Sequence, residues 1–293
     1  MQPATGRGSA EVRFEAAVEA VVHGNLAALE SILRDDPSLV RARSTRAPRS
    51  GAPPHRATLL HYVAANGVED ERQITPDNAV DVARTLLESG AEADALADMY
   101  GGHYPTLSML VSSCHPANAG LQVPLVETLV DFGADVEGRG SGQWTSPLTT
   151  ALAFGYRKAA EALVRRGARV NTLPAAAGLG RLADAERLLP AATAADRHRA
   201  LAMAAQNGQA RIVMLLLDAG EDPNRYNPEG NHGHSAPLHQ AVWAGHLDVV
   251  RVLVERGARL DVKDTIHGAT PLGWATYGGQ RAVAEYLRSK GAP

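Results

Sequence analysis

The chain has 293 residues, a formal net charge of −3, and 45% hydrophobic but only 4% aromatic residues. This charge gives no electrostatic footprint for nucleic acid, and no stretch reaches the roughly 18 consecutive apolar residues that a membrane span needs. The single cysteine, Cys114, excludes an internal disulfide. We therefore expect a soluble, cytoplasmic protein whose core of Ala, Leu and Val is built from close-packed helices.

The N-terminal end has no continuous apolar run, which argues against a signal peptide, and residues 1–13 are expected to be disordered. A helical capping unit is predicted over residues 14–40. The segment 41–57 follows as a basic finger without any acidic residue. A solvated loop is the usual role of such a segment, and a contact for an acidic partner is the alternative. With only three Lys (Lys158, Lys263, Lys290) against many Arg, and much Ala, the composition favours a bacterial source.

From residue 58 onward one pattern recurs along the chain. An amphipathic helix and a glycine turn precede a second helix, which ends in Leu-Leu or Leu-Val and then Gly-Ala, as in ARTLLESGAEAD at 83–94 and RVLVERGARLD at 251–261. The glycines at three successive ends, Gly90, Gly133 and Gly167, lie 43 and 34 residues apart. A helix pair of this length cannot bury its own apolar face, so neighbouring pairs must stack to complete a core.

The beginnings of the units are marked as well, by TLLHYVAANG at 58–67, APLHQAVWAG at 236–245 and TPLGWATYGG at 270–279. Together with the endings, these stretches resemble the ankyrin repeat, with its T-P-L-H-x-A opening and L-L-x-x-G-A ending. The resemblance covers nearly the whole chain from about Phe14. It implies an all-α solenoid of helix pairs with short β-hairpin fingers, which we expect as one domain over 14–293, with seven units at 58–293.

The chain departs from this pattern in several places. Insertions at 68–80 and 115–124 are interpreted as loop decoration, since exposed insertions cost little. A degenerate unit at 175–199 has no Gly-Ala ending, and the turn glycines around it are too closely spaced for fingers. The missing central fingers predict a notch in the concave groove of the solenoid, and the four fingers that remain would form its walls. A decayed repeat without a role is the alternative.

The four surviving fingers, at 98–104, 138–144, 225–235 and 264–268, combine glycine with aromatic and His residues. Glycine lets a ligand approach the backbone, and aromatic side chains supply contact area with little freedom to lose. The candidate contact residues in these fingers are Asp98, Met99, Tyr100, His103, Trp144, Tyr226, His232, His234 and His267.

Two further candidates lie on the helices. Trp243 and Tyr277 each stand two residues before the turn glycine of their unit. The resemblance places this position on the concave helix face, open to a ligand; packing between fingers is the alternative. Trp274 is interpreted mainly as a core residue beside Gly273. His61 and His239 occupy the His of T-P-L-H, which in the family is structural and bonds to the backbone.

Other chemistry is less well supported by the sequence. His232 and His234 form a His-x-His pair, but neither Cys nor a clear acidic ligand accompanies them. Asp98 with His103 is a conceivable acid–base pair if a cleft brings them together. Phosphate-binding, zinc-protease and nucleophile-elbow motifs are absent.

We therefore predict a monomeric module that binds a protein partner in a concave groove, with no cofactor, metal, nucleic acid or membrane. The alternative is a small-molecule-binding protein or an enzyme that uses the notch.

Overall fold

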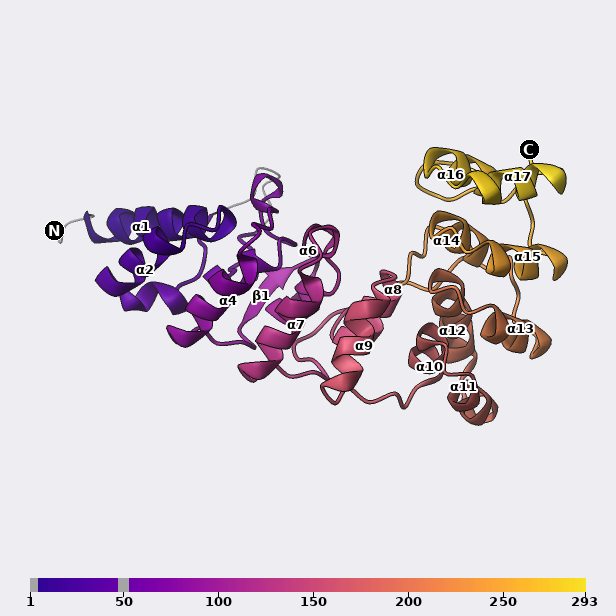
Figure 1. Ribbon diagram of the computed structural model, residues 1–293, viewed down its shortest axis with the longest axis horizontal. Coiled ribbons are helices and arrows are strands. Elements are labelled where there is room, and N and C mark those ends of the chain that lie inside the picture. The colour runs from indigo at the N-terminus through magenta and orange to yellow at the C-terminus, as the bar shows by residue number, and fades with distance from the viewer. Residues whose placement is uncertain (1–4, 47–52) are drawn as a thin grey trace. The chain divides into compact units, whose positions relative to one another are not determined.

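The computed structural model describes residues 5–46 and 53–293 (Figure 1). Within these ranges the chain is mostly helical, and its contacts divide it into two compact parts. The N-terminal part comprises Met1–Thr150 with Ala162–Ala168, and the C-terminal part comprises Ala151–Glu161 with Arg169–Pro293. Each part is described by itself, and a single domain over 14–293 stays a prediction.

The N-terminal part begins with a long helix that extends further than the sequence suggests. α1 runs from Thr5 to Val22, so residues 5–13 are helical rather than disordered, while residues 1–4 lie outside the described chain. Side-chain contacts hold this extension: Thr45 Oγ1 donates to Glu11 at 3.0 Å. The helices that follow are α2 (Leu26–Asp35), η1 (Pro37–Arg41), α3 (Leu59–Val63), η2 (Asp70–Arg72), α4 (Ala79–Glu88), α5 (Thr106–Leu110), α6 (Cys114–Asn118) and α7 (Gln122–Asp131).

The finger at 98–104, which is called the first finger from here on, is an antiparallel hairpin formed by β1 (Leu96–Met99) and β2 (Gly102–Pro105). Its two turn residues, Tyr100 and Gly101, both have positive φ, of 49° and 74°. That combination matches the right-handed twist of the strands in a two-residue turn. Elsewhere in the described residues the fingers contain no second hairpin; the next finger adds one bridge, between His103 and Ser141. The expected β-hairpin geometry is thus present in the first finger, and the later fingers are turns.

The C-terminal part stacks its helix pairs in layers, with α12 beside α14 and α14 beside α16 (Figure 1). Its first helices approach one another closely because they carry small residues; Ala204, Ala241 and Ala275 are fully buried. Leu and Val of the second helices complete this core. The helices are α10 (Leu173–Leu179), α11 (Leu182–Leu188), η3 (Leu189–Ala191), α12 (Ala194–Gln206), α13 (Ala210–Asp218), α14 (Pro237–Trp243), α15 (Leu247–Glu255), α16 (Pro271–Tyr277) and α17 (Arg281–Ser289). α8 (Pro147–Ala153) and α9 (Arg157–Arg165) contribute residues to both parts.

The degenerate repeat consists of α10, α11 and η3. Only Ala192 and Thr193 join η3 to α12, so no finger follows this repeat. Thr193 caps α12 by accepting a hydrogen bond from Asp196 N at 3.1 Å. Residues 194–199 therefore belong to the next repeat rather than to the degenerate one. The notch stays a prediction, because its expected walls belong to different parts of the chain.

Candidate functional site

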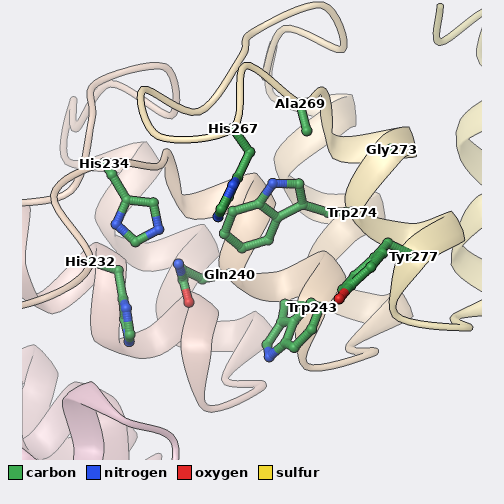
Figure 2. Close-up of a pocket in the computed structure, with 9 residues that line it drawn as sticks. All are labelled: His232, His234, Gln240, Trp243, His267, Ala269, Gly273, Trp274 and Tyr277. Atoms are coloured by element: carbon green, nitrogen blue, oxygen red, sulfur yellow. The ribbon is translucent and has the colours of Figure 1, made fainter.

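A pocket of about 550 Å³ lies in the C-terminal part, between α14, α16 and the loops that precede them. Trp243 and Gln240 come from α14, and Gly273, Trp274 and Tyr277 come from α16 (Figure 2). The two loops are joined where Thr265 N donates to His234 O at 2.8 Å. The remaining residues that line the pocket are His232, His234, His267 and Ala269.

Aromatic rings form most of the wall and meet at different angles. Trp243 and Tyr277 are nearly parallel, with 6.3 Å between ring centroids and 19° between planes. Trp274 stands at 78° to Trp243, with centroids 5.9 Å apart, and at 33° to His234, with centroids 6.0 Å apart. Tyr277 is 88% exposed and Trp243 is 46% exposed. Trp243 and Tyr277, which hold equivalent positions in adjacent repeats, therefore lie side by side, and their role in binding stays a prediction.

Trp274 packs against the hydrophobic core, as its interpretation as mainly a core residue expects, and it also forms a wall of the pocket. It is only partly buried, and the preceding Gly273 has no side chain to cover it. Thr270 caps α16 by accepting a hydrogen bond from Gly273 N at 3.3 Å, and Pro271 fits the first turn. The indole Nε1 donates to Asp264 Oδ2 at 3.0 Å, which fixes the ring.

Asp264 is the organising residue of the last finger. Its carboxylate accepts hydrogen bonds from the backbone N–H of Ile266 at 3.0 Å, His267 at 2.6 Å and Ala269 at 2.9 Å. Burial by itself raises the pKa of this carboxyl, but the backbone donors and the Trp274 indole together lower the pKa well below its usual range. Asp264 therefore carries a negative charge directly against the pocket wall.

The histidines of this region divide into structural and pocket-lining groups. His239 Nδ1 accepts from Ala236 N at 3.3 Å and Nε2 donates to Ala269 O at 3.2 Å, so both ring nitrogens are used by backbone. His61 is bonded in the same way, to Thr58 N at 3.2 Å and Tyr104 O at 3.2 Å. The structural role predicted for both residues agrees with these bonds.

His232 and His234 line the pocket as neutral rings. His232 Nε2 donates to Ala153 O at 3.0 Å, which leaves Nδ1 as an acceptor. Burial lowers the pKa of His232, and the neighbouring His234 lowers it further. Burial is also the main cause that lowers the pKa of His234. Among the residues that the structure describes, no group of three or more His, Cys, Asp or Glu could hold a metal ion.

The candidates of the fingers at 98–104 and 138–144 belong to the N-terminal part and are not among the residues that line this pocket. Asp98 and His103 face each other across the hairpin, with 2.7 Å between Oδ1 and Nδ1, and both are exposed. Tyr100 and Trp144 meet edge to face with centroids 5.6 Å apart. Met99 is a correction: it is 4% exposed, because alternate residues of β1 point inward.

Tyr226 is the remaining finger candidate of the C-terminal part, and it does not line the pocket. Its hydroxyl donates to Lys263 O at 2.6 Å, so it links the two last fingers. The sequence reasoning also missed Gln240, Asp264 and Ala269 as parts of the site. The one available signal was Gly273, which stands beside Trp274 where the repeat pattern has His.

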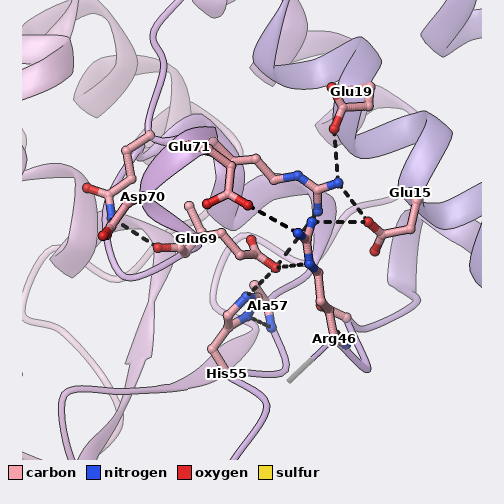
Figure 3. Close-up of polar contacts among 12 residues, drawn as sticks. Glu15, Glu19, Arg46, His55, Ala57, Glu69, Asp70 and Glu71 are labelled. Carbon is pink, nitrogen blue, oxygen red and sulfur yellow. Dashed lines mark hydrogen bonds and ion pairs between the residues drawn. The ribbon is translucent and has the colours of Figure 1, made fainter. Parts of the chain in front are cut away.

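A second cluster, in the N-terminal part, corrects two expectations about loops (Figure 3). In the insertion at 68–80, the side chains of Glu69 and Arg72 are only 8% and 7% exposed. Arg72 Nη2 donates to Glu15 at 2.7 Å and to Glu19 at 2.9 Å, both on α1. Burial alone raises the pKa of Glu69, but the nearby His55 and Arg72 lower it to about 2. This insertion is therefore tied into the fold rather than being exposed decoration.

Arginine side chains of the basic finger at 41–57 also contact other residues of the chain. Arg46 donates to Glu71 at 3.1 Å and lies 3.7 Å from Glu15, and Arg43 donates to Arg56 O at 3.1 Å. Residues 47–52 lie outside the described chain. Arg43 and Arg46 therefore serve internal contacts, and a contact of this finger with an acidic partner stays a prediction.

Comparison with known proteins identifies the class. The family described as ankyrin repeats in three copies matches residues 173–264 and 201–293. Cyclin-dependent kinase 4 inhibitor B of Bos taurus is 36% identical over 118 residues, covering 30% of this chain and 89% of that protein. The chain belongs to the ankyrin-repeat family, whose repeats are generally protein-interaction modules.

Two longer relatives contain the repeats as a small segment. Ankyrin repeat and SAM domain-containing protein 6 of Mus musculus is 40% identical over 85 residues, covering 29% of this chain and 9% of that protein. Ankyrin repeat and KH domain-containing protein mask-1 of Caenorhabditis elegans is 26% identical over 220 residues, covering 72% of this chain and 8% of that protein. The chain thus spans less than a tenth of the length of these two relatives. These relatives are eukaryotic and give no support to a bacterial source. In the described residues, no helix is long and apolar enough to cross a membrane.

Proposed function

We propose that the C-terminal part is a binding module that takes a side chain of a protein partner into the aromatic pocket. The observation that carries this proposal is the exposed pair Trp243 and Tyr277, nearly parallel at the mouth of a pocket of about 550 Å³. Exposed aromatic residues that gather in one patch mark interaction sites, and Trp and Tyr dominate the energy of protein interfaces.

The class of partner follows from the family and from its named relatives. Cyclin-dependent kinase inhibitors are among the relatives, and their names state that they act on another protein. For this chain we propose a protein partner, engaged as a monomer in the cytoplasm. The exposed finger residues His103 and Tyr100 of the N-terminal part would add contacts of their own.

A small molecule is the second candidate, because the pocket volume falls in the range of about 300–1,000 Å³ that is typical of ligand sites. Support for an enzyme is weaker. His232 and His239 each use Nε2 on a backbone carbonyl, and the Asp98–His103 pair lies on an exposed hairpin of the other part.

The test is the double substitution Trp243→Ala/Tyr277→Ala. Both side chains are largely exposed, so the melting temperature should change by only a few degrees. Met214→Ala, an exposed apolar residue on α13 that does not line the pocket, is the matched control. Tagged wild type, control and double variant are each used to capture proteins from cells, and captured proteins are quantified by mass spectrometry.

A specific partner should be retained by the wild type and the control and reduced about tenfold or more with the double variant. Retention of the same proteins by all three would contradict the proposal.

A further inference from the structure

Two polar atoms of the aromatic pocket are left as hydrogen-bond acceptors by the contacts that their side chains make. Gln240 Nε2 donates to Ser235 Oγ at 2.7 Å, so the carbonyl oxygen of this amide is left to accept from a ligand. His232 likewise donates through Nε2 to Ala153 O, so its Nδ1 carries a lone pair that can accept a hydrogen bond. The Trp274 N–H is already used by Asp264. A ligand group that brings its own N–H donors can use both of these acceptors.

The charges near the pocket also favour a cationic ligand. Asp264 is ionised, 2% exposed, and in direct contact with the indole that forms the wall. Apart from histidines, no residue that lines the pocket is basic, and burial keeps His232 and His234 in their neutral forms. A cation placed here would meet a buried negative charge and no fixed positive charge in the lining.

The arrangement of the rings also suits a rounded cation. Trp243 and Trp274 meet at 78° in a T-shaped arrangement, and Tyr277 stacks with Trp243 at 19° between ring planes. The negative faces of aromatic rings attract cations, most strongly for Trp, and a corner of two faces lets one group contact both. An alkylammonium has the shape to do so, whereas a planar guanidinium would stack on one face.

A neighbouring pocket of about 390 Å³ shares Trp243 and is lined by polar groups, among them Gln206, Asn207 and Arg157. Gln206 Oε1 and Asn207 Oδ1 are buried and accept no hydrogen bond from the described residues. A peptide segment that continues across Trp243 would lie over this polar lining. A free amine would leave the neighbouring pocket unused.

We propose that the aromatic pocket selects a lysine side chain on an extended segment of the protein partner. This inference rests on the proposed function and specifies its partner chemistry. The ammonium lies against Trp243, Trp274 and Tyr277 and donates to Gln240 Oε1. The adjoining backbone lies over Gln206 and Asn207.

The experiment uses the full chain and simple probes. N-acetyl-lysine methylamide is compared with its neutral analogue N-acetyl-norleucine methylamide, and choline represents a free quaternary ammonium. Binding is followed through the indole N–H resonances of Trp243 and Trp274. The lysine probe should bind about tenfold more tightly than the norleucine probe, since a desolvated cation on Trp contributes roughly that factor.

Variants at Tyr277 test the role of the rings without endangering the fold, because this residue is 88% exposed. Tyr277→Phe keeps the aromatic face and should preserve the preference for lysine over norleucine. Tyr277→Leu removes the face and should reduce that preference.

Each other outcome overturns the inference in a recognisable way. Equal binding of lysine and norleucine probes would show an apolar pocket without cation selection, and the proposed protein-binding function would stand. Tighter binding of choline than of the lysine probe would show that a free ammonium compound is the ligand. No shift with any probe would overturn the cation inference, while the capture experiment above would still decide the proposed function.

Discussion

Asp264 joins the last finger to the pocket wall through a single buried carboxylate. Three backbone N–H groups of the loop and the Trp274 indole of α16 donate to it. An amide cannot replace it, because one end of an amide is a donor and would face another donor. The finger and the indole should therefore loosen together when the charge is removed.

We expect Asp264→Asn to lower the free energy of unfolding of the C-terminal part by about 1–3 kcal/mol, the range for a buried group left without its hydrogen bonds. Asp261→Asn is the matched control, because Asp261 lies just before this finger in an exposed ion pair with Arg259. Its effect should be much smaller than that of Asp264→Asn. Urea unfolding of both variants measures the difference, and equal effects would contradict the role given to Asp264.

The same residues show what the sequence could and could not predict about the site. Trp243 and Tyr277 hold equivalent positions in adjacent repeats, so the repeat pattern alone brings them together. Trp274 and Asp264 are ten residues apart and belong to a loop and a helix, and only the folded turn aligns indole and carboxylate. Met99 was misplaced because the inward face of a four-residue strand is set by its register, which the sequence does not fix.

At the scale of elements, the insertion containing η2 is attached to α1 by Arg72. This guanidinium is 7% exposed and lies within 4 Å of Glu15, Glu19 and Glu69. Removing one member of a buried ionic cluster leaves uncompensated charges behind, which is costly. Arg72 is thus the residue on which the packing of the insertion most depends.

Arg72→Ala should reduce the free energy of unfolding of the N-terminal part by about 3–5 kcal/mol. Arg165→Ala is the control in the same part, since Arg165 and Glu127 form an ion pair with both side chains exposed. The control should cost less than about 1 kcal/mol. Chemical denaturation followed by Trp144 fluorescence measures the effect of each variant. A small effect of Arg72→Ala would show that the N-terminal part does not require the cluster for its stability.

The helices were predictable because hydrophobic periodicity and turn glycines are local signals. The insertion at 68–80 was visible by its length, but its burial depends on carboxylates more than 50 residues earlier in the chain. Strand formation was predictable only in part. The first finger has a two-residue turn with positive φ, whereas later fingers close through side-chain caps such as Asp264.

At the scale of the whole molecule, both parts bury neutral histidines, and this links their stability to pH. Burial lowers the pKa of His61 to about 4 in the N-terminal part. Burial also lowers the pKa values of His232, His234 and His239 in the C-terminal part. Between the lowered pKa and the unfolded value of about 6.5, the unfolded chain binds more protons than the folded chain. Stability therefore falls as the pH falls through this window.

Lowering the pH from 7.5 to 5.0 should cost the N-terminal part about 2 kcal/mol through His61 alone. Glu69 does not contribute in this range. Its pKa is lowered from 4.5 to about 2, so its contribution is lost as the pH falls from about 4.5 to about 2. The C-terminal part should be destabilised over the same range, because burial lowers the pKa values of its histidines His198, His232, His234 and His239.

Fluorescence can follow the two parts separately, because Trp144 lies in the N-terminal part and Trp243 and Trp274 lie in the C-terminal part. Replacing the tryptophans of one part by Phe leaves a reporter for the other. In this background His61→Gln should lower stability at pH 7.5, since its inter-repeat bonds are lost, yet flatten the pH dependence of the N-terminal transition. The C-terminal transition, which retains its histidines, should keep its full slope. If His61→Gln left both slopes unchanged, buried neutral histidine would not be the cause of the acid sensitivity.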